Sequence, residues 1–339
     1  MTLPQYILLA GHGGSGTKRA CGILDLSAQT HCRQVPYRIG GSVFQRLFND
    51  GGARWGRPGE SSPLMEELWD DAVQQSRSRF SRMDWMPPPP KSHLYQLPRH
   101  LQLWRLVKNN NVRAIFSRLQ PALRGEEWMM PRWLGDRKTL ERAVVVLKLN
   151  KVPGWVAWVL SQRPDVAVIH VVRHPGAYLN AWKGRWFSIS NGNDLAKENR
   201  RRLRQISAVD PEWVDRFPDL GRCSAEQGEL WFWRYCCHRI HQVGESCSRY
   251  LLFKDEDVIN DPLAAARRIY DATGLAFTED IEQRISAKTG EWRAHTAPWT
   301  QLLGPEDTAL VREVLQGSPM QDWWSSEQIV SDFSYNFVA

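Results

Sequence analysis

A glycine-rich stretch near the start of the chain has the residue types that bind an anion. It reads LLAGHGGSGTKRACGILDL from Leu8 to Leu26, with a loop at Gly13, Gly14, Ser15 and Gly16 between an apolar run and a helical pattern. Glycines let backbone N–H groups turn toward one point, and the positive end of the following helix favours negative charge there. We expect this loop to bind phosphate or sulfate.

The residues after the last glycine separate this loop from that of nucleotide triphosphatases. Those loops have the form G-x-x-x-x-G-K-[ST], in which lysine follows the last glycine directly. Here Gly16 is followed by Thr17, and the basic residues Lys18 and Arg19 come one and two positions later. The lysine is therefore out of register for a nucleoside triphosphate.

A second candidate site is the arginine in VAVIHVVRHPGAYLNAW. Arg173 directly follows the apolar run Val166 to Val172 and precedes a helix that should begin at Pro175. Ligands of open α/β sheets bind where parallel strands end, and arginine is suited to bidentate phosphate contact. We expect Arg173 beside the glycine loop, with Asn180 as a further donor.

A third candidate is the segment AKTGEWRAH, from Ala287 to His295. We expect it to form a glycine-bearing loop with the basic residues Lys288, Arg293 and His295, together with Gly290 and Trp292, which alone is weak evidence for a ligand site.

The elements that must position these residues follow an alternating pattern. Near-continuous apolar runs predict four buried strands, and prolines suited to first helical turns predict helices that begin at Pro153, Pro175 and Pro262. The predicted strands are Tyr6 to Ala10, Ala143 to Leu149, Val166 to Val172 and Tyr250 to Phe253. Strands that alternate with helices predict an α/β fold with a central parallel sheet flanked by helices.

Length and charge set further bounds. The 339 residues are enough for one large α/β domain or two smaller ones, and we expect a single domain (1–339) with a largely helical or irregular insertion at about residues 40–142. The formal charge of +7 favours an anionic partner, whether nucleic acid, an acidic lipid surface or a small polyanion. The apolar runs are too short to span a membrane. A strand is predicted within a few residues of the initial methionine, which leads us to expect a cytoplasmic protein without a signal peptide.

Five motifs, two of which overlap at Arg173-His174-Pro175 so that they occupy four segments of the chain, resemble the sulfotransferases that use 3′-phosphoadenosine 5′-phosphosulfate (PAPS). Ser15-Gly16-Thr17 resembles their 5′-phosphosulfate loop, and Arg173-His174-Pro175 resembles their 3′-phosphate motif. LFKDEDVINDPLAAARRIYDATGL and LKLNKVPGWVAWVLSQRPDVAVIHVVRHP are similar to the family's RYEDL-type and EKTP-type stretches, and KTGEWRAH is similar to its G-x-W-K-x-H loop.

The resemblance implies a P-loop NTPase-like sulfotransferase fold, PAPS as co-substrate and no metal requirement. In that family a threonine stands where triphosphatases have lysine, so Thr17 fits. The resemblance also implies a role for the loop residues through Arg19 at the 5′-phosphosulfate. Arg173 and the Lys288–Arg293 segment would lie near the 3′-phosphate. The implied partners are this nucleotide and an unidentified acceptor, with no nucleic acid expected.

Two departures from the family pattern bear on catalysis. The basic residue expected just before the serine is Gly14, so His12, Lys18 or Arg19 would supply that charge. The serine expected eight residues after Arg173 is Ala181, for which Asn180 is a substitute donor.

The general base is not fixed by the motifs. We rank His31 first because it is close in sequence to Gln34 and Val35, the positions nearest to the loop after the second strand of the family pattern, and has a suitable ordinary pKa. Lys151 is second, as a charged or orienting residue that matches the family's KTP lysine. His93 is third.

Three functions remain open at the level of sequence. The leading one is sulfuryl transfer to a hydroxyl or amine of a small molecule, glycan or peptide. The second is a P-loop kinase or nucleoside triphosphate-binding protein. The third is a non-catalytic nucleotide-binding protein on a sulfotransferase scaffold, which the departures at Gly14 and Ala181 keep open.

Overall fold

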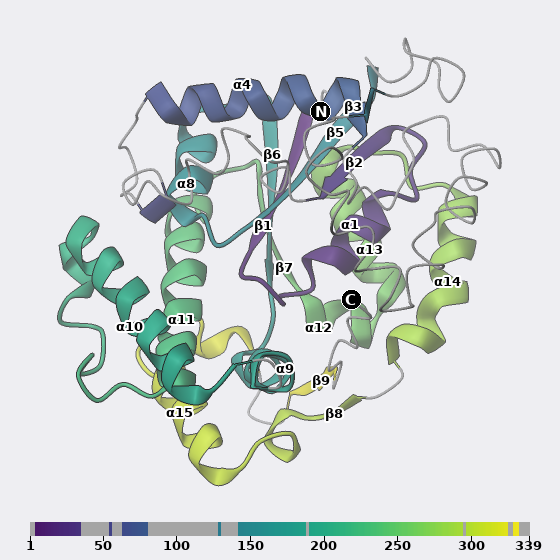
Figure 1. The fold of residues 1–339 in the computed structure, drawn as a ribbon. Helices are drawn as coiled ribbons and strands as arrows, with labels where there is room; N and C mark the ends of the chain where they lie inside the picture. The colour runs from purple at the N-terminus through teal and green to yellow at the C-terminus, as the bar shows by residue number, and fades with distance from the viewer. Residues whose placement is uncertain are drawn as a thin grey trace, which may run out of the picture.

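A five-stranded sheet forms the centre of the molecule (Figure 1). The computed structural model describes residues 4–34, 54–55, 63–80, 128–129, 142–187, 190–293, 296–324 and 328–331. All neighbouring strands of the sheet run parallel, in the order β2-β5-β1-β6-β7. The strands are β1 (Tyr6–Gly11), β2 (Thr30–Gln34), β5 (Val144–Asn150), β6 (Val166–Val172) and β7 (Tyr250–Lys254). The predicted α/β class with a central parallel sheet is confirmed.

The four predicted strands all form, and β2 is added at one edge. Every residue of β1 and β6 is buried, as near-continuous apolar runs predict for central strands. The β2 sequence, THCRQ, is polar by comparison and pairs only with β5 within the sheet. An edge strand needs less apolar surface than a central one, which is why apolar patterning did not single out β2.

Helices cover both faces of the sheet (Figure 1). Alternate strand residues point to opposite faces, so Leu8 and Ala10 pack with α4 (Pro63–Ser78), α8 (Pro153–Gln162) and the end of α11 (Ala225–Gly244). Ile7 and Leu9 pack on the other face with α1 (Thr17–Leu24), α13 (Pro262–Thr273) and α14 (Glu279–Arg293). Apolar packing therefore covers both faces of the sheet, so a ligand-binding site is expected at an edge of the sheet.

The helix starts predicted from proline are confirmed. α8 and α13 begin at Pro153 and Pro262, and α9 (Pro175–Trp186) begins at Pro175. Asp261 caps α13 by accepting a hydrogen bond from the backbone N–H of Ala264 at 3.0 Å. Proline at a first helical position costs no hydrogen bond, so these starts could be read from the sequence.

The remaining elements lie around this core. They are β3 (Arg79–Phe80), β4 (Trp128–Met129), α10 (Gly192–Val209), η5 (Pro211–Trp213), α12 (Asp255–Asn260), β8 (Thr296–Pro298), η6 (Trp299–Gln301), α15 (Pro305–Leu315), η7 (Gln321–Trp323) and β9 (Ile329–Ser331). Most of the predicted insertion at 40–142 lies outside the described residues. Within it, α4 packs Met65, Leu68 and Trp69 into the core.

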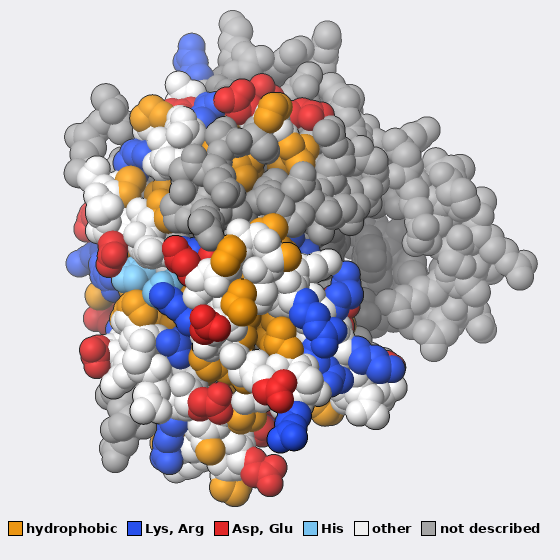
Figure 2. All heavy atoms as spheres, turned by 90° about the vertical axis from the view of Figure 1, so that its left-hand side faces the viewer, with side chains coloured by type: hydrophobic (Ala, Val, Ile, Leu, Met, Phe, Trp, Pro, Cys, Tyr) orange, Lys and Arg blue, Asp and Glu red, His pale blue; other side chains and the backbone are white. Residues whose placement is uncertain are grey.

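The surface that carries α10 mixes charges of both signs. Figure 2 shows Lys and Arg side chains interspersed with Asp and Glu on this side of the molecule. Arg201 and Arg204 are exposed, and Arg201 pairs with Glu198 at 2.8 Å. Of the run Arg200-Arg201-Arg202-Leu203-Arg204 in α10, Arg201 and Arg204 thus form a solvated face, whereas the Arg202 side chain is only 15% exposed.

The strand register brings the candidate segments to one edge of the sheet. Gly11, the last residue of β1, is level with Asn150 of β5 and Val171 of β6. Val172 is in turn level with Lys254 at the end of β7. The glycine loop and the residues after β5, β6 and β7 therefore leave the sheet together.

Candidate functional site

The glycine loop between β1 and α1 has the backbone of an anion cradle. Gly14 and Gly16 have φ values of 95° and 85°, which glycine adopts without strain. Gly16 is the N-cap of α1, and no side chain caps the helix, so its first N–H groups remain available to a ligand. Ser15 is fully buried, and its Oγ finds no hydrogen-bond partner among the described residues. A buried polar atom of this kind marks a place where a ligand or water would bind.

Three neighbouring side chains crowd the glycines of this loop, and at Gly16 there is no room for a Cβ. A Cβ built on Gly13 would lie 3.2 Å from Cε of Lys151, and one on Gly14 would lie 3.3 Å from a ring carbon of Tyr178. A Cβ on Gly16 would lie 2.1 Å from a carboxylate oxygen of Asp255. The loop backbone is thus held in direct contact with charged and polar side chains.

Asp255 joins the two arginines that flank the loop. It is buried at the first residue of α12, directly after β7, and pairs with Arg19 of α1 at 3.0 Å. Nε of Arg173 lies 3.8 Å from the same carboxylate, and its Nη1 donates to the Gly14 carbonyl at 3.4 Å. The structure therefore brings Arg173 to the glycine loop, where its position at the end of β6 predicted it.

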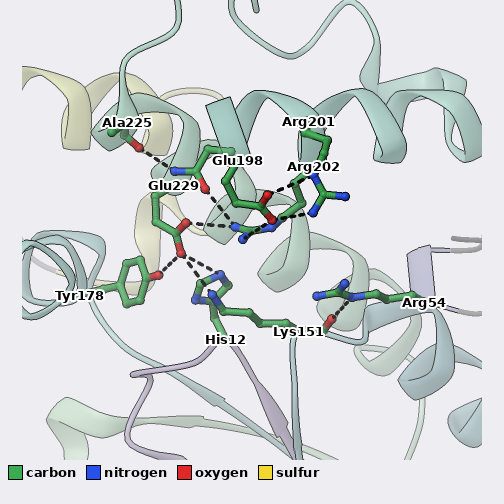
Figure 3. Close-up of polar contacts among 10 residues, drawn as sticks. His12, Arg54, Lys151, Tyr178, Glu198, Arg201, Arg202, Ala225 and Glu229 are labelled. Atoms are coloured by element: carbon green, nitrogen blue, oxygen red, sulfur yellow. Dashed lines mark hydrogen bonds and ion pairs between the residues drawn. The ribbon is translucent and has the colours of Figure 1, made fainter. Parts of the chain in front are cut away.

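A buried polar cluster lies beside the loop, centred on Glu229 of α11 (Figure 3). Its Oε1 accepts hydrogen bonds from the Tyr178 hydroxyl and from Nζ of Lys151, the latter at 3.3 Å. Its Oε2 accepts from Arg202 of α10 at 3.1 Å, and Nε2 of His12 lies 3.7 Å from Oε1. Five elements thus contribute to one cluster at the carboxyl edge of the sheet.

Burial and charge set the protonation of this cluster. Burial alone would raise the pKa of Glu229, but the charges of Lys151 and Arg202 outweigh burial and hold that pKa below its ordinary value. Burial, with help from the Lys151 charge, lowers the pKa of His12 well below its ordinary value. Burial also lowers the pKa of Lys151, against the opposing effect of Glu229. The cluster at neutral pH therefore contains an anionic Glu229 and an uncharged His12.

Lys151 has a strained backbone at the end of β5. Its φ is 63°, the only positive φ of a non-glycine residue among those the structure describes. Its N–H donates to the Gly11 carbonyl at 2.9 Å, and its carbonyl accepts from Nε of Arg54 at 3.2 Å. Such strain persists only where neighbours hold it, and it is common at functional sites.

Comparison with solved structures finds sulfotransferases. One is the sulfotransferase STF9 from Mycobacterium avium, with 13% identity and a TM-score of 0.41 over 92% of this chain and 76% of that chain. The sulfotransferase domain of the Synechococcus PCC 7002 olefin synthase has 16% identity and a TM-score of 0.35, over 93% and 95%. Retinol dehydratase in a complex with retinol and PAP has 11% identity and a TM-score of 0.35, over 94% and 83%.

No family model and no curated protein matches the chain. The functional conclusion rests on the contacts described above.

The structure does not place His31, the first-ranked candidate base, beside the glycine loop. His31 lies in β2 level with Val145, which is itself level with Tyr6 at the start of β1. The glycine loop follows Gly11, five residues further along β1, or roughly 16 Å at the usual rise of a strand. His31 is thus buried at the opposite end of the sheet from the loop. His93, the third candidate base, lies outside the described residues.

The segment predicted as a basic loop at 287–295 is mostly helical. Ala287 to Arg293 form the last turns of α14, with Lys288 and Gly290 exposed. Trp292 is buried in the core with residues of α13. Gly290 does not end the helix, because a glycine in a helix costs only about 1 kcal/mol relative to alanine. A phosphate-binding role for Lys288, Gly290, Trp292 and Arg293 stays a prediction, as does that of Asn180, which is half-buried on α9.

Two of the residues predicted to supply charge near Gly14 are unsuited to that role. His12 is fully buried and uncharged, and Arg19 is paired with Asp255. Lys18 is exposed on α1. Lys151, whose side chain lies against Gly13, is the cation best placed beside the loop.

Glu229, Tyr178 and Arg202 were not identified from the sequence. Glu229 directly precedes the run LWFWRY. An acidic residue beside such an aromatic run is the sequence signal that could have identified it. Its partners on α9 and α10 lie 51 and 27 residues away, so their contact depends on the tertiary fold.

Glu256, next to Asp255, gives a pH-dependent stability prediction. It is buried and accepts hydrogen bonds at 2.9 Å from the His174 N–H and from Nε1 of Trp324. Burial and the Asp255 charge raise its pKa to about 7. A raised pKa in the folded state stabilises the protein below the unfolded pKa, and this stabilisation is lost as pH rises through 7.

We therefore expect Glu256→Gln to reduce the fall in free energy of unfolding between pH 5 and pH 8 by about 2 kcal/mol. Urea unfolding at several pH values measures this difference. Glu306→Gln, at an exposed position, is the control and should follow the wild type. Parallel curves for Glu256→Gln and the wild type would contradict the prediction.

Neither a metal site nor a membrane span is found in the described part of the chain. There, no group of three or more His, Cys, Asp or Glu side chains is arranged to hold a metal ion. No described helix combines the length and apolar character that spanning a membrane requires.

Proposed function

We propose that this chain transfers a sulfuryl group from PAPS to a hydroxyl or amine of a small molecule, glycan or peptide. The observation that carries the proposal is that two basic residues reach the glycine loop, Lys151 at Gly13 and Arg173 at the Gly14 carbonyl. Cations and N–H groups fixed in place before the reaction stabilise charge that develops during group transfer. The ordered resemblance to PAPS-dependent enzymes supports the choice of sulfuryl over phosphoryl transfer.

The loop residues fit the 5′-phosphosulfate of such a donor. The N–H groups of the loop and of the first turn of α1 would hold it, and the buried Oγ of Ser15 offers an unused donor at the same place. Thr17, where a triphosphatase has lysine, suits a ligand without a triphosphate. Bound PAPS supplies an activated sulfuryl group with a good leaving group.

Lys151 is the residue we assign to the positive charge that this family pattern places before the serine. The position itself is Gly14, whose missing side chain leaves space that Tyr178 borders. The side chain of Lys151 reaches the neighbouring Gly13 from the end of β5 and is about one quarter exposed. A cation supplied from another strand thus compensates for the glycine in the loop.

Arg173 is the residue we assign to the 3′-phosphate. Its guanidinium contacts the loop carbonyl of Gly14 and lies beside Asp255, so it is held without a ligand. Because Asp255 already lies between Arg19 and Arg173, it is poorly placed to hold the magnesium that a kinase of nucleoside triphosphates would need. This contact argues against the kinase alternative.

Thermal unfolding with two nucleotides tests the proposal. Adenosine 3′,5′-bisphosphate should raise the melting temperature by several degrees, whereas ATP with magnesium should raise it far less. Arg173→Ala should abolish the shift with the bisphosphate. Arg163→Ala is the matched control, since Arg163 pairs with Asp165 at the opposite end of the sheet and its loss should leave the shift unchanged.

A shift with ATP alone would overturn the proposal in favour of the kinase alternative. Transfer of labelled sulfate from PAPS to a panel of hydroxyl and amine acceptors then separates an enzyme from a non-catalytic nucleotide-binding protein. Binding of the bisphosphate without transfer to any acceptor would favour the binding protein.

A further inference from the structure

We propose that Glu229 is a positioning residue that holds Lys151 against the glycine loop. This inference rests on the proposed function, because it concerns the residue to which we assign the charge at the leaving group. Glu229 lies near the start of α11, and its side chain points toward the loop from the side of the sheet that α11 covers (Figure 3).

The contacts of Glu229 restrict where Lys151 can place its amine. Oε1 accepts from Nζ of Lys151 at 3.3 Å, and the Tyr178 hydroxyl donates to the same oxygen. The Glu229 side chain is only 2% exposed, so water does not compete for it. Tyr178 also borders Gly14, because a Cβ built on Gly14 would lie 3.3 Å from its ring, so one of the side chains around Lys151 lies beside the loop.

Arg202 allows a carboxylate to remain charged in this position. A buried anion without a partner is costly, and a second cation offsets that cost. Arg202 pairs with Oε2 of Glu229 at 3.1 Å and lies over the Phe232 ring at 4.3 Å, while Nζ of Lys151 lies 5.3 Å from the centre of the same ring. Arg202 therefore does not occupy the oxygen that faces Lys151, which accepts from Lys151 and Tyr178 and lies 3.7 Å from Nε2 of His12.

Glu229 also opposes the loss of the Lys151 proton. Burial and the charge of Arg202 lower the pKa of Lys151, and Glu229 raises it. The titratable and charged groups around Lys151 are Glu229 and Cys236 of α11, Arg202 of α10, Tyr178 of α9, His12 after β1 and Arg54. Of these, Glu229 is the carboxylate in contact with the amine, so its removal should act directly on the protonation of Lys151.

The first test measures Lys151 without relying on activity. Competitive labelling of lysines with acetic anhydride over a pH series, read by mass spectrometry, gives the pKa of the Lys151 amine. In Glu229→Gln that pKa should fall by at least one unit. Glu198→Gln is the matched control, because Glu198 pairs with Arg201 and Arg202 and not with Lys151, and it should leave the pKa unchanged.

The second test measures transfer. In Glu229→Gln we expect kcat to fall at least tenfold with KM for PAPS changed less than threefold, and the alkaline limb of the kcat profile to move to lower pH. A merely structural role would weaken folding without moving that limb. Glu229→Asp keeps the charge beside Arg202 on a shorter side chain and should give an intermediate shift. If Glu229→Gln does not fold, Glu229→Asp alone tests the positioning role of Glu229.

An unchanged Lys151 pKa in Glu229→Gln, or in Glu229→Asp if only that variant folds, overturns the positioning role. This result is distinct from failure of the proposed function, in which the wild type transfers no sulfate although Glu229 still controls the labelling of Lys151. A fall in the pKa together with a shifted alkaline limb supports both.

Discussion

The substitution Gly16→Ala is expected to abolish thermal stabilisation by adenosine 3′,5′-bisphosphate and to lower the free energy of unfolding by about 2–4 kcal/mol. The new Cβ would lie 2.1 Å from an Asp255 carboxylate oxygen, and a φ of 85° is strained for any residue with a side chain. Relief would require Asp255 to move away from Arg19 and Arg173. Urea unfolding and thermal shifts measure the two effects.

Gly22→Ala is the control for this substitution. Gly22 lies in the same helix, α1, and a Cβ there would meet nothing within 4 Å. The change should stabilise the protein by about 0.5–1 kcal/mol and leave bisphosphate binding intact, because alanine restricts the unfolded chain more than glycine does. Wild-type bisphosphate binding in Gly16→Ala would show that the ligand does not lie in this loop.

The substitution Lys151→Met is expected to lower kcat for sulfate transfer by about 10²–10³-fold, with a smaller effect on bisphosphate binding. The change removes the amine beside Gly13 and keeps most of the side-chain volume. In the wild type, kcat should decline at alkaline pH with a midpoint below 10.5, because burial lowers the pKa of Lys151 and transfer needs its charged form. A pH series of kcat for both proteins measures this limb.

Lys197→Met controls for the loss of a lysine. Lys197 is exposed on α10 and should give wild-type kcat and the wild-type pH profile. If Lys151→Met transferred sulfate at the wild-type rate, Lys151 would have no role in the mechanism. Lys18 would then be the next candidate for the positive charge.

The centre of the sheet could be predicted because the strands β1, β5 and β6 are buried on both faces. Apolar runs such as VAVIHVV carry their own signal, and the prolines at 153, 175 and 262 mark the helix starts that follow. The strand THCRQ lacks this signal since it lies at an edge. The segment that ends at Arg293 was mistaken for a loop because glycine marks a turn only when the backbone needs it, and here α14 continues through Gly290.

The site could be predicted where its residues directly follow the end of a strand in the sequence. The glycine loop and Arg173 both do, so the parallel topology alone brings them together. His31 was chosen for its type and its nearness in sequence, and neither fixes which end of the strand it occupies. Glu229 was missed because its role depends on how α11 packs against α9 and α10, which no local pattern reports.

The backbone of Lys151 shows that this edge of the sheet is a compromise between stability and activity. A left-handed conformation costs a lysine of order 1 kcal/mol, which glycine would avoid. Glycine at 151 would, however, remove the one amine that lies against the loop from this strand. A sequence optimised for stability alone would thus be expected to lose the lysine first, so consensus-style stabilisation of this enzyme candidate should leave position 151 untouched.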